Sequence, residues 1–376
     1  MTGVLDEVDA TIRDTLLSNG FDPALFERLR AEVGAGRLSP ESNVVRGTIE
    51  PPRAEDITRL PEPGESGWDA AYERGAEAIR QGQVAMTVLN GGMATRFGGG
   101  VKGIVEAVDG RSFLEWKLAE AARVAAALGG TVPCLVMNSF ATDKPTVDFL
   151  GSCGERGATL PQPIFFTQFV SLRLNRDGSL FRESDGRPSL YAPGHGDFPE
   201  ALRRSGVLGR LCDRGVRQIM LSNVDNLGAR VDPAVVGAHL LAARPITVEV
   251  TAKEPGDSGG APARVDGRVI HLERFRFPPD FDQDSIPVFN TNSFVFDLEA
   301  LEQDVALTWF YVEKSVEDRP AVQLERLVNE LTSFLPTTFL QVPRGGPRGR
   351  FFPIKEQEDL PAAQPTLREM LAASVV

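Results

Sequence analysis

The chain has 376 residues, of which 42% are hydrophobic and 24% are charged, and its formal net charge is −12. A chain of this size and composition buries a substantial core in one large domain or in two to three smaller ones. The acidic balance argues against a nucleic-acid partner, and the lack of any run of about 18 apolar residues argues against a membrane span.

The cysteines and the first residues indicate the compartment. Cys134, Cys153 and Cys212 are odd in number and show no CxxC spacing, which argues against a disulfide framework or a structural zinc site. The opening segment MTGVLDEVDATIRDTLLSNG carries acidic residues in an amphipathic pattern and does not resemble a signal peptide. We therefore expect a cytoplasmic protein.

Residues 1–83 are predicted to be a helical N-terminal extension. Apolar residues recur at helical spacing in 4–20 and in 21–36, and again from Trp68 to Arg80. Between these helices the Pro- and Gly-rich stretch 51–67 is typical of a surface loop.

Residues 84–340 are predicted to form an α/β domain, followed by a short C-terminal segment, 341–376. The apolar runs VAMTVL, VPCLVMN and QIMLSN predict buried parallel strands, and FLEWKLAEAARVAAAL predicts a helix. PITVEVTAK, VIHLERFRF and PVFNTNSFVFDL predict further strands. This alternation indicates a Rossmann-like, largely parallel sheet with helices on both faces.

Polar residues follow three of these predicted strands where each one ends. They are Asn90-Gly91-Gly92, Asn138-Ser139 and the segment 223–226, which reads Asn-Val-Asp-Asn. Ligands of such sheets bind beyond the carboxyl ends of the strands, so we expect a site at this edge.

The glycine-rich stretch VLNGGMATRFGGGVKG, residues 88–103, favours a phosphate ligand. Glycines let backbone N–H groups approach a ligand closely, and Arg96 and Lys102 supply positive charge. The spacing fits neither the dinucleotide pattern GxGxxG nor the P-loop. A tight structural turn with surface charges therefore stays open as the alternative.

Taken together, seven stretches resemble the UTP–glucose-1-phosphate uridylyltransferase (UDP-glucose pyrophosphorylase) family, and they follow the order of the family. They are LNGGMATRFGGGVKG, VMNSFATDKPT, APGHGDFPEAL, LSNVDNLGARVD, the span from EVTAKEPGDSGGAP to FNTNSFVF, QLERL, and VPRGGPRGRFFPIK. The resemblance covers residues 84 to 360.

The resemblance implies the fold of the nucleotide-diphospho-sugar transferases and a nucleotidyl transfer. An oxygen of a sugar 1-phosphate attacks the α-phosphorus of a nucleoside triphosphate, and pyrophosphate leaves. UTP and glucose 1-phosphate are the substrates that it implies, with Mg²⁺ as the cofactor. Such chemistry depends on positioning and charge neutralisation rather than on a covalent intermediate.

The resemblance also implies roles for particular residues. Lys102, Lys355 and Asp225 are the expected catalytic residues, and Asp225 is also the expected metal ligand. The expected nucleotide-binding residues are Leu89, Gly91, Gly92, Arg96, Met137, Gln168 and Gly194. The expected sugar-phosphate-binding residues are His195, Asn223, Glu249, Gly260 and Asn292.

Several of these residues have a purely structural alternative. Met137 at a strand end is as typical of a core as of a nucleotide site, and a lone histidine such as His195 is often structural. An Asx turn would explain Asn226, and Asn290 would serve to cap a bulge.

Departures from the family leave the substrates and the assembly open. Ala94, Val101 and the sequence NTNS alter the expected base and sugar surroundings, so GTP, TTP or a cyclitol 1-phosphate remains an alternative. A non-catalytic sugar-nucleotide-binding regulator is an alternative of another class. Family members commonly continue into a left-handed β-helix, but only about twenty residues follow Lys355 here. We expect that domain to be absent and leave the oligomeric state undetermined.

Overall fold

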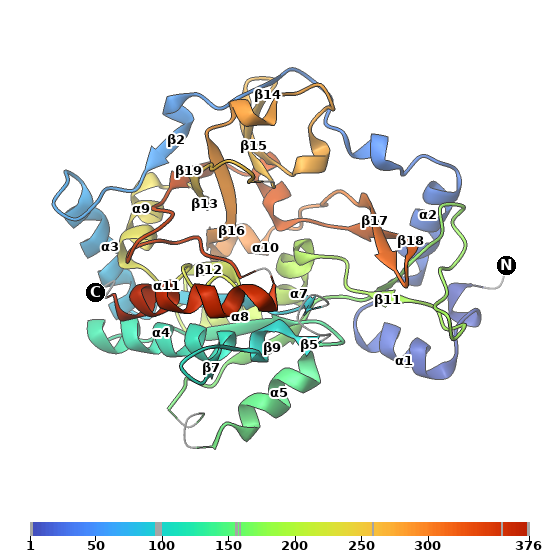
Figure 1. Ribbon diagram of the computed structural model, residues 1–376, viewed down its shortest axis with the longest axis horizontal. Helices are drawn as coiled ribbons and strands as arrows, with labels where there is room; N and C mark the ends of the chain where they lie inside the picture. Colours follow the sequence, from blue (N-terminus) through green and yellow to red (C-terminus); the bar gives the residue numbers. More distant parts are fainter. Residues whose placement is uncertain are drawn as a thin grey trace.

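An eight-stranded sheet runs through the centre of the molecule in the order β2-β19-β13-β16-β12-β3-β8-β9 (Figure 1). The computed structural model describes residues 3–94, 100–154, 157, 159–257, 259–354 and 356–373. The strands of the sheet are β2 (Ile57–Arg59), β3 (Val84–Leu89), β8 (Cys134–Asn138), β9 (Ile164–Thr167), β12 (Gln218–Asn223), β13 (Ile246–Ala252), β16 (Val288–Asp297) and β19 (Thr337–Gln341). Neighbouring strands are parallel except at β16, which is antiparallel to both β12 and β13. The predicted α/β class and the largely parallel sheet are confirmed.

Helices cover both faces of the sheet because the side chains of its strands alternate between two cores. In β3, Val84, Met86 and Val88 pack into one core, while Ala85 and Leu89 pack into the other. The helices are α1 (Ala10–Ser18), α2 (Pro23–Gly34), α3 (Trp68–Arg80), α4 (Phe113–Leu128), α5 (Asp143–Ser152), α7 (Phe198–Arg204), α8 (Val207–Asp213), α9 (Pro233–Ala242), α10 (Leu298–Glu302) and α11 (Leu360–Ala372). Helices α3, α4, α9 and α11 cover the first face, and α7, α8 and α10 cover the second.

Local sequence explains where α4 begins and ends. Ser112 and Glu115 form a capping box at its start, in which each side chain accepts from the backbone N–H of the other residue. Gly129 ends the helix in the left-handed conformation, with φ of 70°. These signals explain why the prediction from periodicity matches the observed bounds.

The N-terminal segment contains α1, α2 and α3, and it also contributes strands to the sheets. Within the stretch predicted as a loop, β2 pairs with β19 at the edge of the central sheet. Strand β1 (Ile49–Glu50) pairs with β14 (Ala261–Val265), which in turn pairs with β15 (Arg268–Leu272). Strands of two or three residues carry no detectable periodicity, so only pairing with a distant edge defines them.

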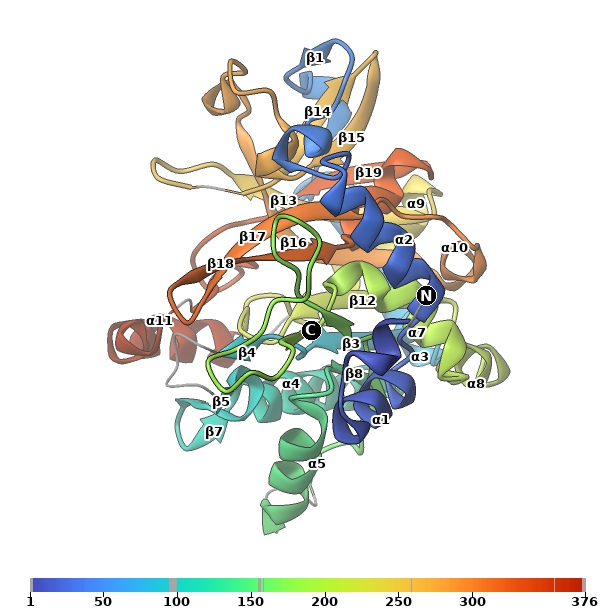
Figure 2. The same ribbon diagram turned by 90° about the vertical axis from the view of Figure 1, so that its right-hand side faces the viewer.

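The first two helices pack far from α3, beside the hairpin of β17 (Phe310–Val316) and β18 (Arg319–Glu325) (Figures 1 and 2). Ile12 and Leu16 of α1 share a core with Val322 and Leu324 of the hairpin. Short two-stranded ribbons lie around the central sheet, formed by β4 (Met93–Ala94) with β5 (Gly100–Val101), β6 (Glu106–Val108) with β7 (Arg111–Ser112), and β10 (Ser171–Leu172) with β11 (Leu190–Tyr191).

The C-terminal segment returns to the central sheet. After β19 the chain forms a loop, and α11 then packs Leu360, Leu367 and Leu371 into the core shared with α4. Within the described ranges, no helix combines the length and the apolar character that crossing a membrane requires.

A buried ion pair joins this returning segment to the sheet. Arg350 and Glu249 are each 1% exposed, and the guanidinium donates to both carboxylate oxygens, from Nε to Oε2 at 2.5 Å and from Nη2 to Oε1 at 2.8 Å. Nη2 also donates to the carbonyl of Arg230. A bidentate pair that is removed from water in this way is costly to break from one side only, because the remaining charge stays buried.

We therefore expect Arg350→Met to lower the free energy of unfolding by about 3–5 kcal/mol, as for other buried pairs that lose one partner. Urea denaturation measures this change. Arg176→Met is the matched control, because Arg176 makes an equally bidentate pair with Glu313 on the surface. Equal urea midpoints for the two variants would contradict the expectation that breaking the buried pair costs more stability than breaking the surface pair.

Candidate functional site

Three neighbouring parallel strands bring their carboxyl ends to one edge of the sheet. Asn223 of β12 lies opposite Leu89 of β3, and Leu89 lies opposite Met137 of β8. The loops that follow these strands therefore begin side by side, as the sequence predicts.

Asn90, directly after β3, holds the start of the glycine-rich loop. Its Nδ2 donates to Asn138 Oδ1 at 2.8 Å and to Thr146 Oγ1 at 2.9 Å, and the residue is 1% exposed. Gly103 packs against it so closely that a Cβ there would lie 2.2 Å from Asn90 Oδ1. The sequence predicts Asn90 only as a polar residue at a strand end and predicts no role for Gly103, because these contacts depend on distant partners.

Two glycines of the loop have different reasons to be glycine. A Cβ on Gly91 would lie 2.3 Å from Nε2 of Gln168, whose own backbone N–H donates to the Asn138 carbonyl at 2.9 Å. Gly92 is exposed, and a Cβ there would meet no described atom within 4 Å. Gly91 thus admits the Gln168 amide, while Gly92 leaves bare backbone open to a ligand.

Lys102 and Asp225 meet at this edge of the sheet. Lys102 Nζ donates to Asp225 Oδ2 at 2.7 Å, and the two side chains are 16% and 18% exposed. The other carboxylate oxygen, Oδ1, is buried and has no hydrogen-bond partner among the described residues. A charged group and an unused acceptor therefore stand together where the predicted phosphates would lie.

The C-terminal segment reaches the same loop. Asn226 forms a β-bridge with Pro353, Ile354 N–H donates to the Asp225 carbonyl at 3.4 Å, and Asn226 Nδ2 donates to the Arg350 carbonyl at 3.0 Å. Lys355 follows Ile354 in the sequence, but Lys355 and Arg96 lie outside the described residues, so the structure gives no position for either.

A bulge in β16 presents Asn292 to the site. The residue has φ of +53°, and its N–H donates to Asn290 Oδ1 at 3.0 Å, so Asn290 caps the bulge. Asn292 Nδ2 donates to Asn223 Oδ1 at 3.0 Å, while Asn292 Oδ1 has no described partner. A left-handed asparagine whose acceptor has no partner among the described residues is compatible with the expected binding role.

His195 lies on the turn after Gly194. Val328 N–H donates to its Nδ1 at 3.1 Å, and burial lowers the pKa of His195 to about 4. The ring is therefore neutral at physiological pH and carries its proton on Nε2, as a hydrogen-bond donor. Gly194 has φ of +99°, and a Cβ there would lie 2.7 Å from the Arg326 carbonyl, so this glycine is required by packing.

The side chains of other residues expected at the site pack in the core or contact distant parts of the chain. The Glu249 carboxylate, expected near sugar hydroxyls, is sealed in the core by Arg350. The Met137 side chain is 1% exposed and packs in the core, as does that of Leu89. Gly260 packs against the His271 ring, and its carbonyl accepts from Asn290 N–H at 3.1 Å. Spacing along the chain predicts none of these orientations, because each depends on a distant partner.

The donor set at this edge is compatible with Mg²⁺ bound jointly with phosphates. The described part of the chain contains no group of three or more His, Cys, Asp or Glu side chains placed to hold a metal ion. However, Mg²⁺ in phosphate-binding sites commonly uses one or two carboxylates together with substrate oxygens and water. Asp225 Oδ1, which accepts no hydrogen bond from the described residues, fits that pattern.

Similarity to a known family extends over most of the chain. The family profile described as UTP–glucose-1-phosphate uridylyltransferase matches residues 35–375. The chain belongs to this family. The matched span includes every described residue that the site brings together.

Among curated members of the UTP–glucose-1-phosphate uridylyltransferase family, a probable enzyme of that name from Schizosaccharomyces pombe is 27% identical over 96% of this chain and 72% of its own length. The enzyme from Astragalus penduliflorus is 31% identical over 77% of this chain. The chain spans 63% of the length of that plant relative.

A solved structure shares the fold. The uridine diphosphate N-acetylglucosamine pyrophosphorylase from Trypanosoma brucei, solved with an inhibitor, superposes with a TM-score of 0.77 at 20% identity. The match covers 98% of this chain and 80% of that one. This agreement confirms the predicted nucleotide-diphospho-sugar transferase fold.

We predict that His195 stays neutral, with its proton on Nε2, at every pH above about 5, because its pKa is lowered to about 4. Imidazole ¹⁵N shifts measured between pH 5 and 8 test this. A His195→Gln variant should lower kcat/KM by about tenfold or more without changing the shape of the pH profile. A titration of His195 near pH 6.5 would contradict the prediction.

Proposed function

We propose that this chain joins UTP and glucose 1-phosphate to give UDP-glucose and pyrophosphate, with Mg²⁺ as cofactor and in the cytoplasm. The observation that carries the proposal is the Lys102–Asp225 pair, which stands at the strand ends beside the open backbone of Gly92 in a chain of this family. The thiol of Cys134 is buried and forms no disulfide, which agrees with a reducing compartment.

In the proposed reaction, an oxygen of glucose 1-phosphate attacks the α-phosphorus of UTP in line with the departing pyrophosphate. No general base is needed for this attack, because a phosphate monoester already carries a reactive oxyanion. This agrees with the neutral state of His195, which serves as a hydrogen-bond donor to the sugar phosphate. The protein contributes alignment and charge neutralisation.

Charge neutralisation is assigned to three residues. Asp225 Oδ1 would hold Mg²⁺, which supplies positive charge to the phosphate oxygens when it is bound. Lys102, which pairs with the other oxygen of Asp225, is placed to contact the triphosphate. Lys355 is assigned to the opposite side of the reacting phosphate on the family resemblance, and the Ile354–Asp225 hydrogen bond supports that assignment.

Base and sugar recognition are assigned to the flanking loops. The Gln168 amide is assigned to the uracil edge, because a side-chain amide both donates and accepts, as an imide requires. Its contact with Gly91 supports this role. Asn223, Asn292 and His195 are assigned to the sugar phosphate, supported by the unused acceptor of Asn292 and the Nε2 donor of His195.

The test is a panel assay of pyrophosphate release. UTP, GTP, TTP, CTP and ATP are each offered with several sugar 1-phosphates and one cyclitol 1-phosphate, with and without Mg²⁺. We expect the UTP and glucose 1-phosphate pair to react fastest, and only with the metal present. Binding of UDP-glucose without turnover of any pair would instead support a non-catalytic regulator.

Asp225→Asn should lower kcat by about a hundredfold to a thousandfold, because the amide cannot replace a carboxylate at a metal. Steady-state kinetics across a Mg²⁺ titration measures this. The control is Asp148→Asn, which alters an exposed carboxylate paired with Lys144 on α5. Equal kcat for Asp225→Asn and the wild type would overturn the assigned metal ligand.

Lys355→Ala should depress kcat more than it raises the KM for glucose 1-phosphate, since the role assigned to Lys355 is to stabilise charge that develops during transfer. Kinetics at saturating UTP separates the two effects. Unchanged turnover would refute this role for Lys355.

A further inference from the structure

Two loops of the proposed site contact the same buried carboxylate. One carries Gln168, assigned to the base, and the other carries His195, assigned to the sugar phosphate. Asp197, two residues after His195, is fully buried. Its Oδ2 accepts from the backbone N–H of Phe169 at 3.1 Å, and Phe169 directly follows Gln168. Its Oδ1 accepts from Arg326, from Nη2 at 2.6 Å and from Nε at 3.1 Å.

Arg326 holds the His195 loop through its backbone as well. Its N–H donates to the Pro193 carbonyl at 2.8 Å, and its carbonyl accepts from Gly196 N–H at 2.9 Å. A Cβ on Gly196 would lie 2.3 Å from the carbonyl carbon of Arg326, so the two backbones touch. The loop and the end of β18 therefore form one packed unit.

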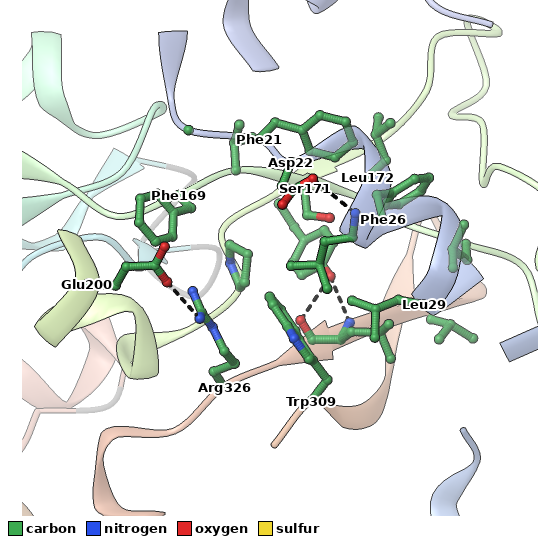
Figure 3. A pocket seen from close by; sticks show the side chains of 18 of the residues that line it. Phe21, Asp22, Phe26, Leu29, Phe169, Ser171, Leu172, Glu200, Trp309 and Arg326 are labelled. Carbon is green, nitrogen blue, oxygen red and sulfur yellow. Dashed lines mark hydrogen bonds and ion pairs between the residues drawn. The ribbon is translucent and has the colours of Figure 1, made fainter. Parts of the chain in front are cut away.

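The guanidinium of Arg326 also fixes the position of an aromatic ring. It lies 4.6 Å from the Trp309 ring centre and 5.7 Å from that of Phe169, and its Nη1 donates to Glu200 at 2.9 Å (Figure 3). Two carboxylates and two rings thus surround one planar cation, an arrangement that suits arginine and not lysine.

Phe169 lines a small cavity. A cavity of about 90 Å³ lies between Phe169, Arg326 and Trp309 on one side and α2 on the other (Figure 3). Loss of the Arg326 guanidinium would enlarge this cavity and remove one of the contacts that hold the Phe169 ring, and with it the adjacent Gln168. Arg326 shares the task of holding this ring with the Arg204 guanidinium, 4.9 Å from the ring centre, and with Gly20, which packs against the ring. The Asp197 hydrogen bond holds the backbone of Phe169.

We propose that Arg326 is a positioning residue that sets base selectivity, by holding Phe169 and Asp197 so that the Gln168 amide stays against Gly91. The proposal rests on the proposed function, in which Gln168 reads uracil. It predicts that loss of Arg326 weakens discrimination between bases more than it weakens catalysis in general.

The test is the ratio of kcat/KM for UTP to that for CTP. This ratio does not depend on the fraction of folded enzyme, so a merely destabilised variant leaves it unchanged. We expect Arg326→Met to lower the ratio by about fivefold to tenfold, the amount that one lost hydrogen bond represents. Arg326→Lys, which keeps the charge without the fork, should restore part of it.

Two further variants keep the test decisive. Arg326→Met leaves the Asp197 carboxylate buried without its partner, so the double variant Asp197→Asn/Arg326→Met is measured beside it. Arg319→Met is the matched control, because Arg319 on the same hairpin lies 4.6 Å from the Phe181 ring centre and pairs with Glu317, away from the site. An unchanged UTP-to-CTP ratio of kcat/KM in Arg326→Met and in the double variant would overturn the proposal.

A second measurement needs no turnover. Hydrogen exchange of the Phe169 backbone amide should be at least about tenfold faster in Arg326→Met than in Arg319→Met, since that amide donates to Asp197. If the wild type transfers no nucleotide, the proposed function fails while this exchange rate still decides the positioning role. Equal exchange in the two variants would overturn it.

Discussion

A single carboxylate, Asp225, joins three parts of the chain that are far apart in sequence. One of its oxygens accepts from Lys102 at the end of the glycine-rich loop, and its backbone carbonyl accepts from Ile354 in the returning C-terminal segment. The residue itself lies just beyond β12, where parallel strands place their ligands. The proposed site depends on this convergence, because the proposed charge neutralisation around a triphosphate requires cations and a metal ligand at the same point.

Beneath that carboxylate lies an unusually polar part of the core. Lys117 of α4 is 2% exposed and donates to Ser222 Oγ at 3.0 Å and to the Ala229 carbonyl at 2.7 Å, and burial lowers its pKa to about 7. The Arg350–Glu249 pair lies in the same layer. These groups tie α4, β12, β13 and the C-terminal segment together with directional bonds, which apolar packing alone does not supply. The layer therefore fixes the backbone on which Asp225 stands.

Close packing explains two of the glycines in the site motifs, because neighbouring groups leave no room for a Cβ. Gly91 admits the Gln168 amide, and Gly194 admits the backbone of Arg326. The glycines of a motif thus report close approaches between distant segments as well as contacts with a ligand. The hydrogen bond from Phe169 N–H to Asp197 links the Gln168 loop, proposed to read the base, with the His195 loop, proposed to hold the sugar phosphate.

The sequence by itself determined the α/β class, most of the buried strands and the edge at which the site is proposed. Apolar runs, the spacing of apolar residues and polar residues after a strand are local features that can be read along the chain. Tertiary structure alone decided which polar residues face that edge. Glu249 and Asn292 lie on neighbouring strands, yet Arg350 draws the first into the core, while a bulge turns the second toward Asn223. The short strand β2 and the Asp197–Arg326 pair were equally invisible, because each exists only through a partner more than a hundred residues away.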